Sequence, residues 1–300
     1  MPDEQLLDCL VIGGGVAGLM SAVYLKRYRR NVLVVDAGKS RLRLIPRTRN
    51  VIGFPDGIPG TELWDRIREH AARYGAEVAH GCIDRLERAG DGTFDAWSGE
   101  QHWRARYVIL ATGASDVAPE IGGLDAALQG GQLRYCPVCD GFETQGQRVA
   151  VLGRAGHGLR ESLFVAGFGN EVTWLAMQTQ DEVAPEDLAR LRECGVRIAE
   201  QYPRHIHCTP GQGVEVELQG GTRLAFDVIY PALGLTHVSE LALALGAQAQ
   251  ADGQLKVDAH QQTTVPGLYA AGDVSVDLNQ ISVAAAHAAI AATAIHNSLL

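Results

Sequence analysis

Apolar runs and glycine-rich turns alternate along the chain, and their spacing predicts the order of its elements. Residues 6–12 are a short apolar run with β-branched members, which predicts a strand. A glycine-rich turn follows at 13–18, and the stretch after it, to about residue 28, is typical of a helix. A second apolar strand is predicted at 31–35 and ends in Asp36. The chain therefore begins with a strand, a turn, a helix and a strand.

The following part of the chain predicts a helix and an antiparallel group of strands. Leu63, Ile67 and Ala71 recur at helical spacing, so a helix is predicted over 61–74 with Thr61 as its N-cap. The remaining pattern predicts strands at 77–86, 93–97 and 103–111, with a hairpin turn at 90–92. Between the two parts, the four arginines of 41–49 indicate a solvated basic loop, and the turn-rich residues 50–60 indicate a loop that folds over a ligand.

The order of strand, glycine turn and helix then recurs. It is predicted as a strand at 148–152, a turn at 153–158, a helix at 159–168 and a strand at 171–175. Later elements are predicted as a helix at 187–194, strands at 196–199, 214–218 and 226–230, a strand at 267–271, and an alanine-rich helix to about residue 298. Two copies of one strand, turn and helix unit indicate an α/β protein.

Composition narrows the class of protein. A chain of 300 residues, 46% hydrophobic and with 35 glycines, is long enough for two domains. Its net charge of -9 argues against a nucleic-acid binder. The apolar run at 6–25 contains Asp8 and four glycines, so it is interpreted as folded protein and not as a signal peptide or membrane span. Six cysteines with one close pair do not form a secreted disulfide framework, which favours a reducing, cytoplasmic location.

The first glycine turn has the features of a dinucleotide-binding motif. Gly13 permits a tight turn, Gly15 lets the backbone approach a pyrophosphate, and Gly18 lets the helix pack closely on the strand. Asp36 follows the second strand at the spacing of an acid that binds a ribose hydroxyl. This combination favours a dinucleotide site over an ordinary glycine-rich turn.

Five further residues, at three places in the chain, suit contacts with a cofactor. Thr112 and Gly113 follow a strand and are small enough for the strand end to lie against a ligand. Gly272 and Asp273 end another apolar strand, where the acid can bond to polyol hydroxyls. Gln280 lies at the start of the last helix, whose positive N-terminus suits a ring carbonyl.

A pair of thiols lies between the two glycine motifs. Cys136 and Cys139 are separated by two residues, so they can form a disulfide on oxidation and transfer an electron pair. Asp140 follows directly and is placed to move the proton that thiolate chemistry requires. The alternative, two structural cysteines near a turn, is disfavoured by the cofactor motifs on either side.

No metal site is predicted. A tetrahedral zinc site requires four ligands, and one Cys-x-x-Cys pair supplies only two. His205 and His207 alternate next to Cys208, but no further ligand follows at a suitable spacing. The remaining cysteines stand alone in the sequence, at Cys9, Cys82 and Cys194.

The second glycine motif is incomplete. Ala155 occupies the middle glycine position, where its methyl group would crowd a pyrophosphate. Residues 176–180, after the next strand, contain no acid for a ribose and no arginine for a 2′-phosphate. His157 is interpreted as a structural histidine in the turn. The second module thus has the order of a nicotinamide site without its contacts.

Taken together, these motifs resemble the low-molecular-weight thioredoxin reductase family of flavoproteins over essentially the whole chain. The resemblance depends on the order GGGVAG, an acid after the second strand, ATG, CPVCDG, a degenerate glycine motif and AAGDV. It implies an α/β fold of two Rossmann-like, three-layer dinucleotide-binding domains, the second inserted in the first. By that resemblance, residues 1–115 and 240–300 form an FAD domain, and 116–239 form a degenerate NAD(P)-binding-like domain that carries the dithiol. The family also implies a homodimer.

The resemblance also implies roles for individual residues. Cys139 would face the flavin, Cys136 would attack the disulfide of the partner, and Asp140 would move the proton. The residues that would hold FAD are Gly13, Gly15, Gly18, Asp36, Asp273 and Gln280. The expected thiol partner is a thioredoxin-like protein or a small dithiol or disulfide.

One departure from the family changes the expected function. Its nicotinamide domain carries a His-Arg-Arg stretch and a further arginine for NADPH, where this chain has Ala176, Met177, Gln178 and Glu182. The leading hypothesis is therefore an FAD-dependent dithiol/disulfide oxidoreductase whose donor is not NADPH, with ferredoxin as one candidate donor. Two alternatives remain at this point: an oxygen-dependent dithiol oxidase of the same fold, and a flavin and thiol redox sensor without turnover.

Overall fold

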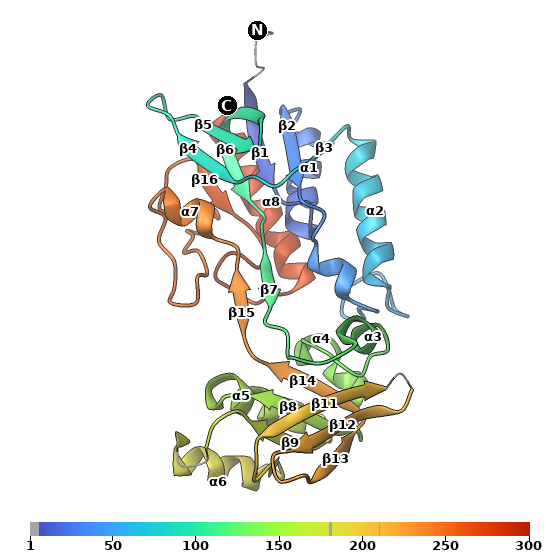
Figure 1. The fold of residues 1–300 in the computed structure, drawn as a ribbon. Coiled ribbons are helices and arrows are strands. Elements are labelled where there is room, and N and C mark those ends of the chain that lie inside the picture. The colour runs from blue at the N-terminus through green and yellow to red at the C-terminus, as the bar shows by residue number, and fades with distance from the viewer. Residues whose placement is uncertain (1–5, 180–181, 210) are drawn as a thin grey trace. The chain divides into compact units, whose positions relative to one another are not determined.

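The computed structural model describes residues 6–179, 182–209 and 211–300, and the chain divides into two units (Figure 1). Unit 1 comprises residues 1–43, 59–115 and 236–300. Unit 2 comprises residues 44–58 and 116–235. The inserted position of unit 2 follows the order that the resemblance implies, but the boundaries differ. The segment 44–58 and residues 236–239 lie in the other unit from the one expected.

Unit 1 is built on a seven-stranded sheet in the order β3-β2-β1-β6-β5-β4, with β16 paired to β6. Its parallel part joins β1 to β2 and β6, β2 to β3, and β6 to β16. Its antiparallel part is the meander of β4, β5 and β6. The strands are β1 (Leu7–Ile12), β2 (Val32–Asp36), β3 (Glu77–His80), β4 (Arg85–Arg88), β5 (Phe94–Ser98), β6 (Gln101–Leu110) and β16 (Leu268–Ala270).

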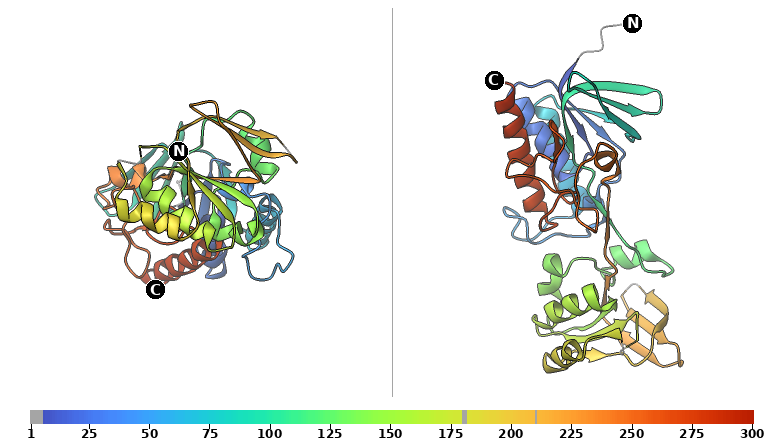
Figure 2. Two further views of the ribbon diagram at one scale, coloured as in Figure 1. Left: turned by 90° about the horizontal axis from the view of Figure 1, so that it is seen from below. Right: turned by 90° about the vertical axis from the view of Figure 1, so that its left-hand side faces the viewer.

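Alternate side chains of the central strands enter two cores, one on each face of this sheet. Along β1, Cys9 and Val11 pack on one face with α1 and α8, while Leu10 and Ile12 pack on the other face with the meander. Helix α8 lies beside α1, as Figure 2 shows. The helices of unit 1 are α1 (Val16–Arg27), α2 (Gly60–Arg73), α7 (Glu240–Ala244) and α8 (Ile281–Ser298), with the 3₁₀ turn η1 at Arg41–Leu44.

Two details of the predicted elements of unit 1 were wrong. The helix predicted from Thr61 begins at Gly60, with Pro59 at the N-cap position and no side-chain cap. The strand predicted at 77–86 divides into β3 and β4, and β3 is parallel to β2, not part of the antiparallel group. The reason is that Gly81 ends β3, where its amide bonds to the carbonyl oxygen of Asp36 at 3.0 Å.

Unit 2 contains a four-stranded parallel sheet in the order β10-β9-β8-β14 and an antiparallel sheet in the order β11-β12-β13. A core of apolar side chains around Trp174, which is fully buried, fills the space between the parallel sheet and its helices. The strands are β8 (Arg148–Gly153), β9 (Glu171–Ala176), β10 (Arg197–Ile198), β11 (Pro203–Thr209), β12 (Gly213–Leu218), β13 (Arg223–Phe226) and β14 (Val228–Ala232).

The helices of unit 2 include the short turns around the dithiol. They are α3 (Leu124–Gln129), α4 (Pro137–Asp140), the 3₁₀ turn η2 (Gly141–Thr144), α5 (Ala155–Ala166) and α6 (Pro185–Glu193). Helix α5 begins at Ala155, within the glycine turn, and not at 159 as predicted, because Gly158 donates its amide hydrogen to Arg154. Where the chain passes between units, β7 (Ala114–Asp116) pairs with β15 (Leu235–His237).

Candidate active site

The two thiols of unit 2 form a disulfide within a single helical turn. Cys136 is the N-cap of α4, Pro137 occupies its first turn, and the amide of Cys139 bonds to the carbonyl oxygen of Cys136 at 2.9 Å. This turn brings the two Cα atoms to 5.2 Å, and the sulfur atoms are bonded at 2.03 Å. Both cysteines are half-buried. A disulfide closed within one helical turn and not fully buried is suited to reversible thiol exchange.

Asp140 ends the same helical turn, and two side chains hold its carboxyl group. The Tyr230 hydroxyl donates to its Oδ1 at 2.7 Å, and a guanidinium nitrogen of Arg134 lies 3.6 Å from its Oδ2. Burial raises the pKa of Asp140, while Arg134 and Tyr230 act in the opposite direction. A carboxyl group with a raised pKa next to a thiol pair is suited to proton transfer.

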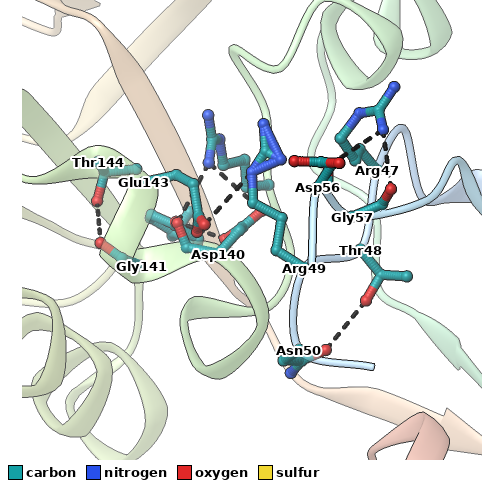
Figure 3. Close-up of polar contacts among 12 residues, drawn as sticks. Arg47, Thr48, Arg49, Asn50, Asp56, Gly57, Asp140, Gly141, Glu143 and Thr144 are labelled. Atoms are coloured by element: carbon teal, nitrogen blue, oxygen red, sulfur yellow. Dashed lines mark hydrogen bonds and ion pairs between the residues drawn. The ribbon is translucent and has the colours of Figure 1, made fainter. Parts of the chain in front are cut away.

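The segment 44–58 belongs to the same unit, and Figure 3 shows the polar contacts that hold it, including one with Glu143 of η2. Arg49 forms an ion pair with Glu143 of η2 at 3.4 Å. Arg47 donates to the carbonyl oxygens of Asp56 and Gly57 at 3.3 and 3.1 Å. Both arginines are exposed, as expected for a solvated basic loop, and they also hold the segment in place.

The glycines of the first turn of unit 1 differ in how much space surrounds them. A Cβ atom on Gly13 would lie 2.3 Å from the Ala111 carbonyl oxygen, and one on Gly18 would lie 1.8 Å from that of Gly13. These two glycines are required by the fold itself. A Cβ atom on Gly15, in contrast, would meet only the Ser40 hydroxyl at 3.5 Å. The space beside Gly15 is the kind that a diphosphate requires.

Asp36 is held at the edge of this turn. Its Oδ1 accepts hydrogen bonds from the backbone nitrogens of Gly14 at 3.0 Å and Gly38 at 3.1 Å. The Trp64 indole nitrogen donates to the Gly14 carbonyl oxygen at 3.0 Å and further fixes the turn. The carboxylate is thereby oriented for an additional donor such as a ribose hydroxyl.

The C-terminal part of the chain brings its predicted residues to the same end of the sheet. Asp273 follows β16 and pairs with Arg41 at 2.8 Å. Gly272 has a φ of +81°, and a Cβ atom there would lie 3.0 Å from that of Ala17 in α1. Gln280 is the N-cap of α8. Asp273 and the start of α8 therefore lie on the side of the sheet where α1 begins.

Thr112 and Gly113 form hydrogen bonds with Val238, near the point where the chain re-enters unit 1. The Thr112 hydroxyl donates to the Val238 carbonyl oxygen at 2.5 Å, and the Val238 amide bonds to the Gly113 carbonyl oxygen at 3.0 Å. Gly113 has a φ of +72°, which favours glycine at this position. These two residues thus join separate parts of unit 1.

The second glycine turn differs from the first at Ala155, the position that corresponds to Gly15. The Gln178 side chain accepts a hydrogen bond from the Ala155 backbone nitrogen at 3.0 Å, in the first turn of α5. A bound phosphate would use such backbone donors at a helix N-terminus. Ala155 itself is half-buried and packs against the core of unit 2. Met177 is 41% exposed, and Gln180 lies outside the described residues.

The structure also identifies two ionisable residues that the sequence did not indicate. Burial raises the pKa of Glu161, in α5, to about 7, and Asp116 acts in the same direction. The Glu161 Oε2 atom is buried and has no hydrogen-bond partner among the described residues. The second such residue is Tyr230. It lies in an apolar strand, and the residues next to it in the sequence do not indicate its contact with Asp140.

The histidines considered as ligands have other surroundings. His205 and His207 lie on β11, and their rings are 6.2 Å apart. Over the described ranges, no group of three or more potential metal ligands is found. His157 lies in α5, where one ring nitrogen is 3.4 Å from Arg160. In the part of the chain that the structure describes, no helix is both long and apolar enough to cross a membrane.

With this geometry in place, comparison with known proteins defines the class. Residues 7–291 match the family described as pyridine nucleotide-disulphide oxidoreductase, and the chain belongs to that family. The sequence is similar to the thioredoxin reductase of Bacillus subtilis, with 27% identity over 99% of this chain and 96% of that protein. It is also 28% identical to the thioredoxin reductase of Aquifex aeolicus, over 99% and 94% of the two chains.

Solved structures give the same result. The thioredoxin reductase of Streptococcus pyogenes has a TM-score of 0.90 and 25% identity, with 99% of each chain covered. HlmI has a TM-score of 0.91 and 27% identity, covering 100% of this chain and 94% of that one. The predicted fold class is thus confirmed, and the protein is a thioredoxin-reductase-like, FAD-dependent disulfide oxidoreductase.

Proposed function

We propose that this flavoprotein exchanges electron pairs between FAD and a thiol partner through Cys136 and Cys139, without depending on NADPH. Independence of NADPH is inferred from one observation, the hydrogen bond between the Gln178 side chain and the Ala155 amide at 3.0 Å. This contact uses a donor that a nucleotide phosphate would require. Electron exchange through the two cysteines is inferred from the dithiol, from Asp140 and from the family to which the chain belongs.

The residues around Gln178 also argue against NADPH as the electron donor. Ala176, Met177 and Gln178 offer no guanidinium group to a 2′-phosphate. Each charge-assisted hydrogen bond to such a phosphate contributes about 1.5 to 3 kcal/mol. Loss of two of them corresponds to about a hundredfold or more in affinity. Reduced ferredoxin or another protein is therefore the better candidate donor.

The chain's own residues account for the thiol step. The Cys136 thiolate attacks one sulfur of the partner disulfide, that bond breaks, and a mixed disulfide forms. The Cys139 thiolate then attacks Cys136, the Cys136–Cys139 bond forms, and the partner leaves as a dithiol. Asp140 carries a proton given up by the pair to the leaving partner thiolate. When bound, FAD supplies the electron pair that reduces the new disulfide again.

The cofactor contacts that we propose follow the geometry of unit 1. The space beside Gly15 accepts the diphosphate, and Asp36 bonds to the adenosine ribose. Asp273 bonds to the polyol chain, and the N-terminus of α8 at Gln280 stabilises negative charge on the ring. The remaining positions, Gly13, Gly18, Thr112, Gly113 and Gly272, shape the backbone around it. On this assignment, unit 1 is the FAD domain and unit 2 the degenerate nicotinamide-type domain.

A thioredoxin-like protein is the partner that we propose first, with a small dithiol or disulfide as the second. The large apolar side chains that are exposed in unit 2 include Ile52 by 97%, Val138 by 46% and Phe142 by 72%. Val138 lies between the two cysteines, and Phe142 follows three residues after Cys139. Exposed apolar groups beside a reactive centre are typical of a protein docking surface. We further propose a cytoplasmic homodimer, by resemblance to the family.

Anaerobic stopped-flow spectroscopy of the purified protein tests this function. The bound flavin is mixed separately with NADPH, NADH, reduced ferredoxin and dithiothreitol. We expect dithiothreitol and a protein donor to bleach the flavin much faster than either pyridine nucleotide. Fast reoxidation of the dithiol-reduced protein by oxygen would instead identify a dithiol oxidase. Absence of turnover with every thiol partner would identify a sensor.

A further inference from the structure

Tyr230 is a polar residue in a place where the sequence predicts only packing. It lies at the centre of β14, whose five residues are all buried, and Tyr230 itself is fully buried. A phenolic hydroxyl removed from water requires a hydrogen-bond partner. That partner is Asp140, whose Oδ1 lies 2.7 Å from the hydroxyl. A buried strand thus contacts a residue of the redox site directly.

The backbone fixes this contact. The Ile229 amide bonds to the Gln132 carbonyl oxygen at 2.8 Å, and the Arg134 amide bonds to the Ile229 carbonyl oxygen at 3.0 Å. The segment that leads to the dithiol is therefore attached to β14 one residue before Tyr230. On its other side, Tyr230 pairs with Val151 of β8. The hydroxyl has little freedom to move away from Asp140.

The charged groups around Asp140 come from several elements. Arg134 lies 3.6 Å from Oδ2 and also donates to the Asp140 carbonyl oxygen at 3.3 Å. Glu143 of η2 raises the pKa of Asp140, and it is paired with Arg49 of the segment 44–58 at 3.4 Å. Burial acts in the same direction as Glu143. Arg134 and Tyr230 are the groups that favour the ionised carboxylate.

We infer that Tyr230 is a positioning residue for the redox reaction, whose hydroxyl orients Asp140 and stabilises its carboxylate form for proton transfer. This inference rests on the proton-transfer role proposed for Asp140. Burial and the neighbouring Asp140 raise the pKa of Tyr230 far above its usual range. Tyr230 therefore stays protonated during turnover, and it acts as a fixed donor and not as the proton carrier.

The test measures the rate of flavin reduction by dithiothreitol as a function of pH. In this direction Asp140 accepts a proton from the dithiol, so the rate, after correction for the thiolate fraction of dithiothreitol, falls as Asp140 becomes protonated. Asp140→Asn should remove this acid limb and thereby identify it. Tyr230→Phe should shift the limb upward, because the carboxylate loses a donor that lowers its pKa. Tyr74→Phe, which removes a hydroxyl from a residue that is 44% exposed in unit 1, should leave it in place.

A second variant tests the same contact without deleting it. Incorporation of 3-fluorotyrosine at position 230 makes the phenol a stronger donor, so the acid limb should shift downward, opposite to Tyr230→Phe. Flavin content and circular dichroism show whether each variant is folded. If Tyr230→Phe does not fold, the fluorotyrosine protein decides the question by itself.

The results distinguish failure of the proton role proposed for Asp140 from failure of the positioning role inferred for Tyr230. If Asp140→Asn keeps the acid limb, the proton role of Asp140 in the proposed function is wrong. If Asp140→Asn removes the limb but neither change at Tyr230 moves it, only the inference about Tyr230 is overturned. A loss of rate that is equal at every pH in Tyr230→Phe would also overturn it, since it would indicate packing alone.

Discussion

The side-chain oxygen of Gln178 lies 3.0 Å from the backbone nitrogen of Ala155, in the first turn of α5. In unit 1 the corresponding turn faces only Ser40 beside Gly15, and its acid, Asp36, bonds instead to Gly14 and Gly38. The two glycine turns share an order of elements, but the space beside Gly15 is open, whereas the Ala155 amide is already bonded to Gln178. This difference determines the first prediction.

Restoring the nucleotide contacts should increase reactivity with NADPH. Ala155→Gly, Met177→Arg and Gln178→Arg together remove the internal contact and supply two guanidinium groups, worth about 1.5 to 3 kcal/mol per charge-assisted bond. We expect the triple variant to bind NADPH about a hundredfold or more tightly than the wild type, measured by calorimetry. Ala155→Gly alone serves as the control. Rapid reduction of the wild-type flavin by micromolar NADPH would contradict our account of unit 2.

Gly15→Val should give colourless protein. The wild type is expected to carry about one FAD per chain, because the motif is complete. Since a Cβ atom at Gly15 would meet only Ser40 at 3.5 Å, the substitution should spare the fold and block the ligand. Absorbance at the flavin band against protein concentration measures the stoichiometry.

The matched control for this change lies in the second turn. A Cβ atom on Gly156 would meet no atom within 4 Å, so Gly156→Val introduces the same side chain without a clash. It should keep its flavin. A fully flavinated Gly15→Val protein would show that the diphosphate binds elsewhere.

The two cysteines should behave differently when each is replaced. If Cys139 exchanges electrons with the flavin, Cys136→Ser leaves a thiolate that can donate to the oxidised ring and should produce a long-wavelength charge-transfer band. Cys139→Ser should lack that band. Absorption spectra of the two variants across pH test the assignment, and identical spectra would overturn it.

Stability should depend on pH through Glu161. Its pKa is about 7 in the folded protein against 4.5 when unperturbed, so the folded state retains a proton that the unfolded state releases. The free energy of unfolding should therefore fall as pH rises from 4.5 to 7, by up to about 3 kcal/mol. Below 4.5 both states are protonated, and this contribution is constant.

Glu161→Gln should remove most of that dependence. The variant is neutral at every pH, so it should be more stable than the wild type at pH 8 and similar at pH 4. Urea unfolding at both pH values measures the difference. Glu193→Gln, at an exposed position of α6, is the control and should behave as the wild type does. Parallel curves for wild type and Glu161→Gln would refute the proposed titration.

Local patterns predicted most of the elements and the positions of several candidate site residues. The turn at Gly13, Gly15 and Gly18, the acid at Asp36 and the start of α8 at Gln280 each follow from spacing over a few residues. The contacts that tune the chemistry do not. Tyr230 is 90 residues from Asp140 along the chain. No period or motif connects residues so far apart in sequence.

Contacts between residues far apart in sequence also explain the errors in the predicted fold. The strand β3 pairs with β2, although the residues near it in sequence form an antiparallel meander. The segment 44–58 joins unit 2 through contacts such as Arg49 with Glu143, which only tertiary structure creates. Arginine-rich composition at 41–49 predicted solvent, but Arg41 instead pairs with Asp273. Long-range pairing decided each case.

The division of unit 1 between both ends of the chain constrains how the protein is made. Strand β16 and helix α8 come from the last part of the chain, yet they pair with β6 and pack on α1. A ribosome therefore releases Gly15 and Asp36 long before the residues near Asp273 and Gln280 exist. We expect unit 2, whose main segment is continuous from 116 to 235, to fold during synthesis. Flavin loading then becomes a late, post-translational event, and truncated nascent chains remain colourless.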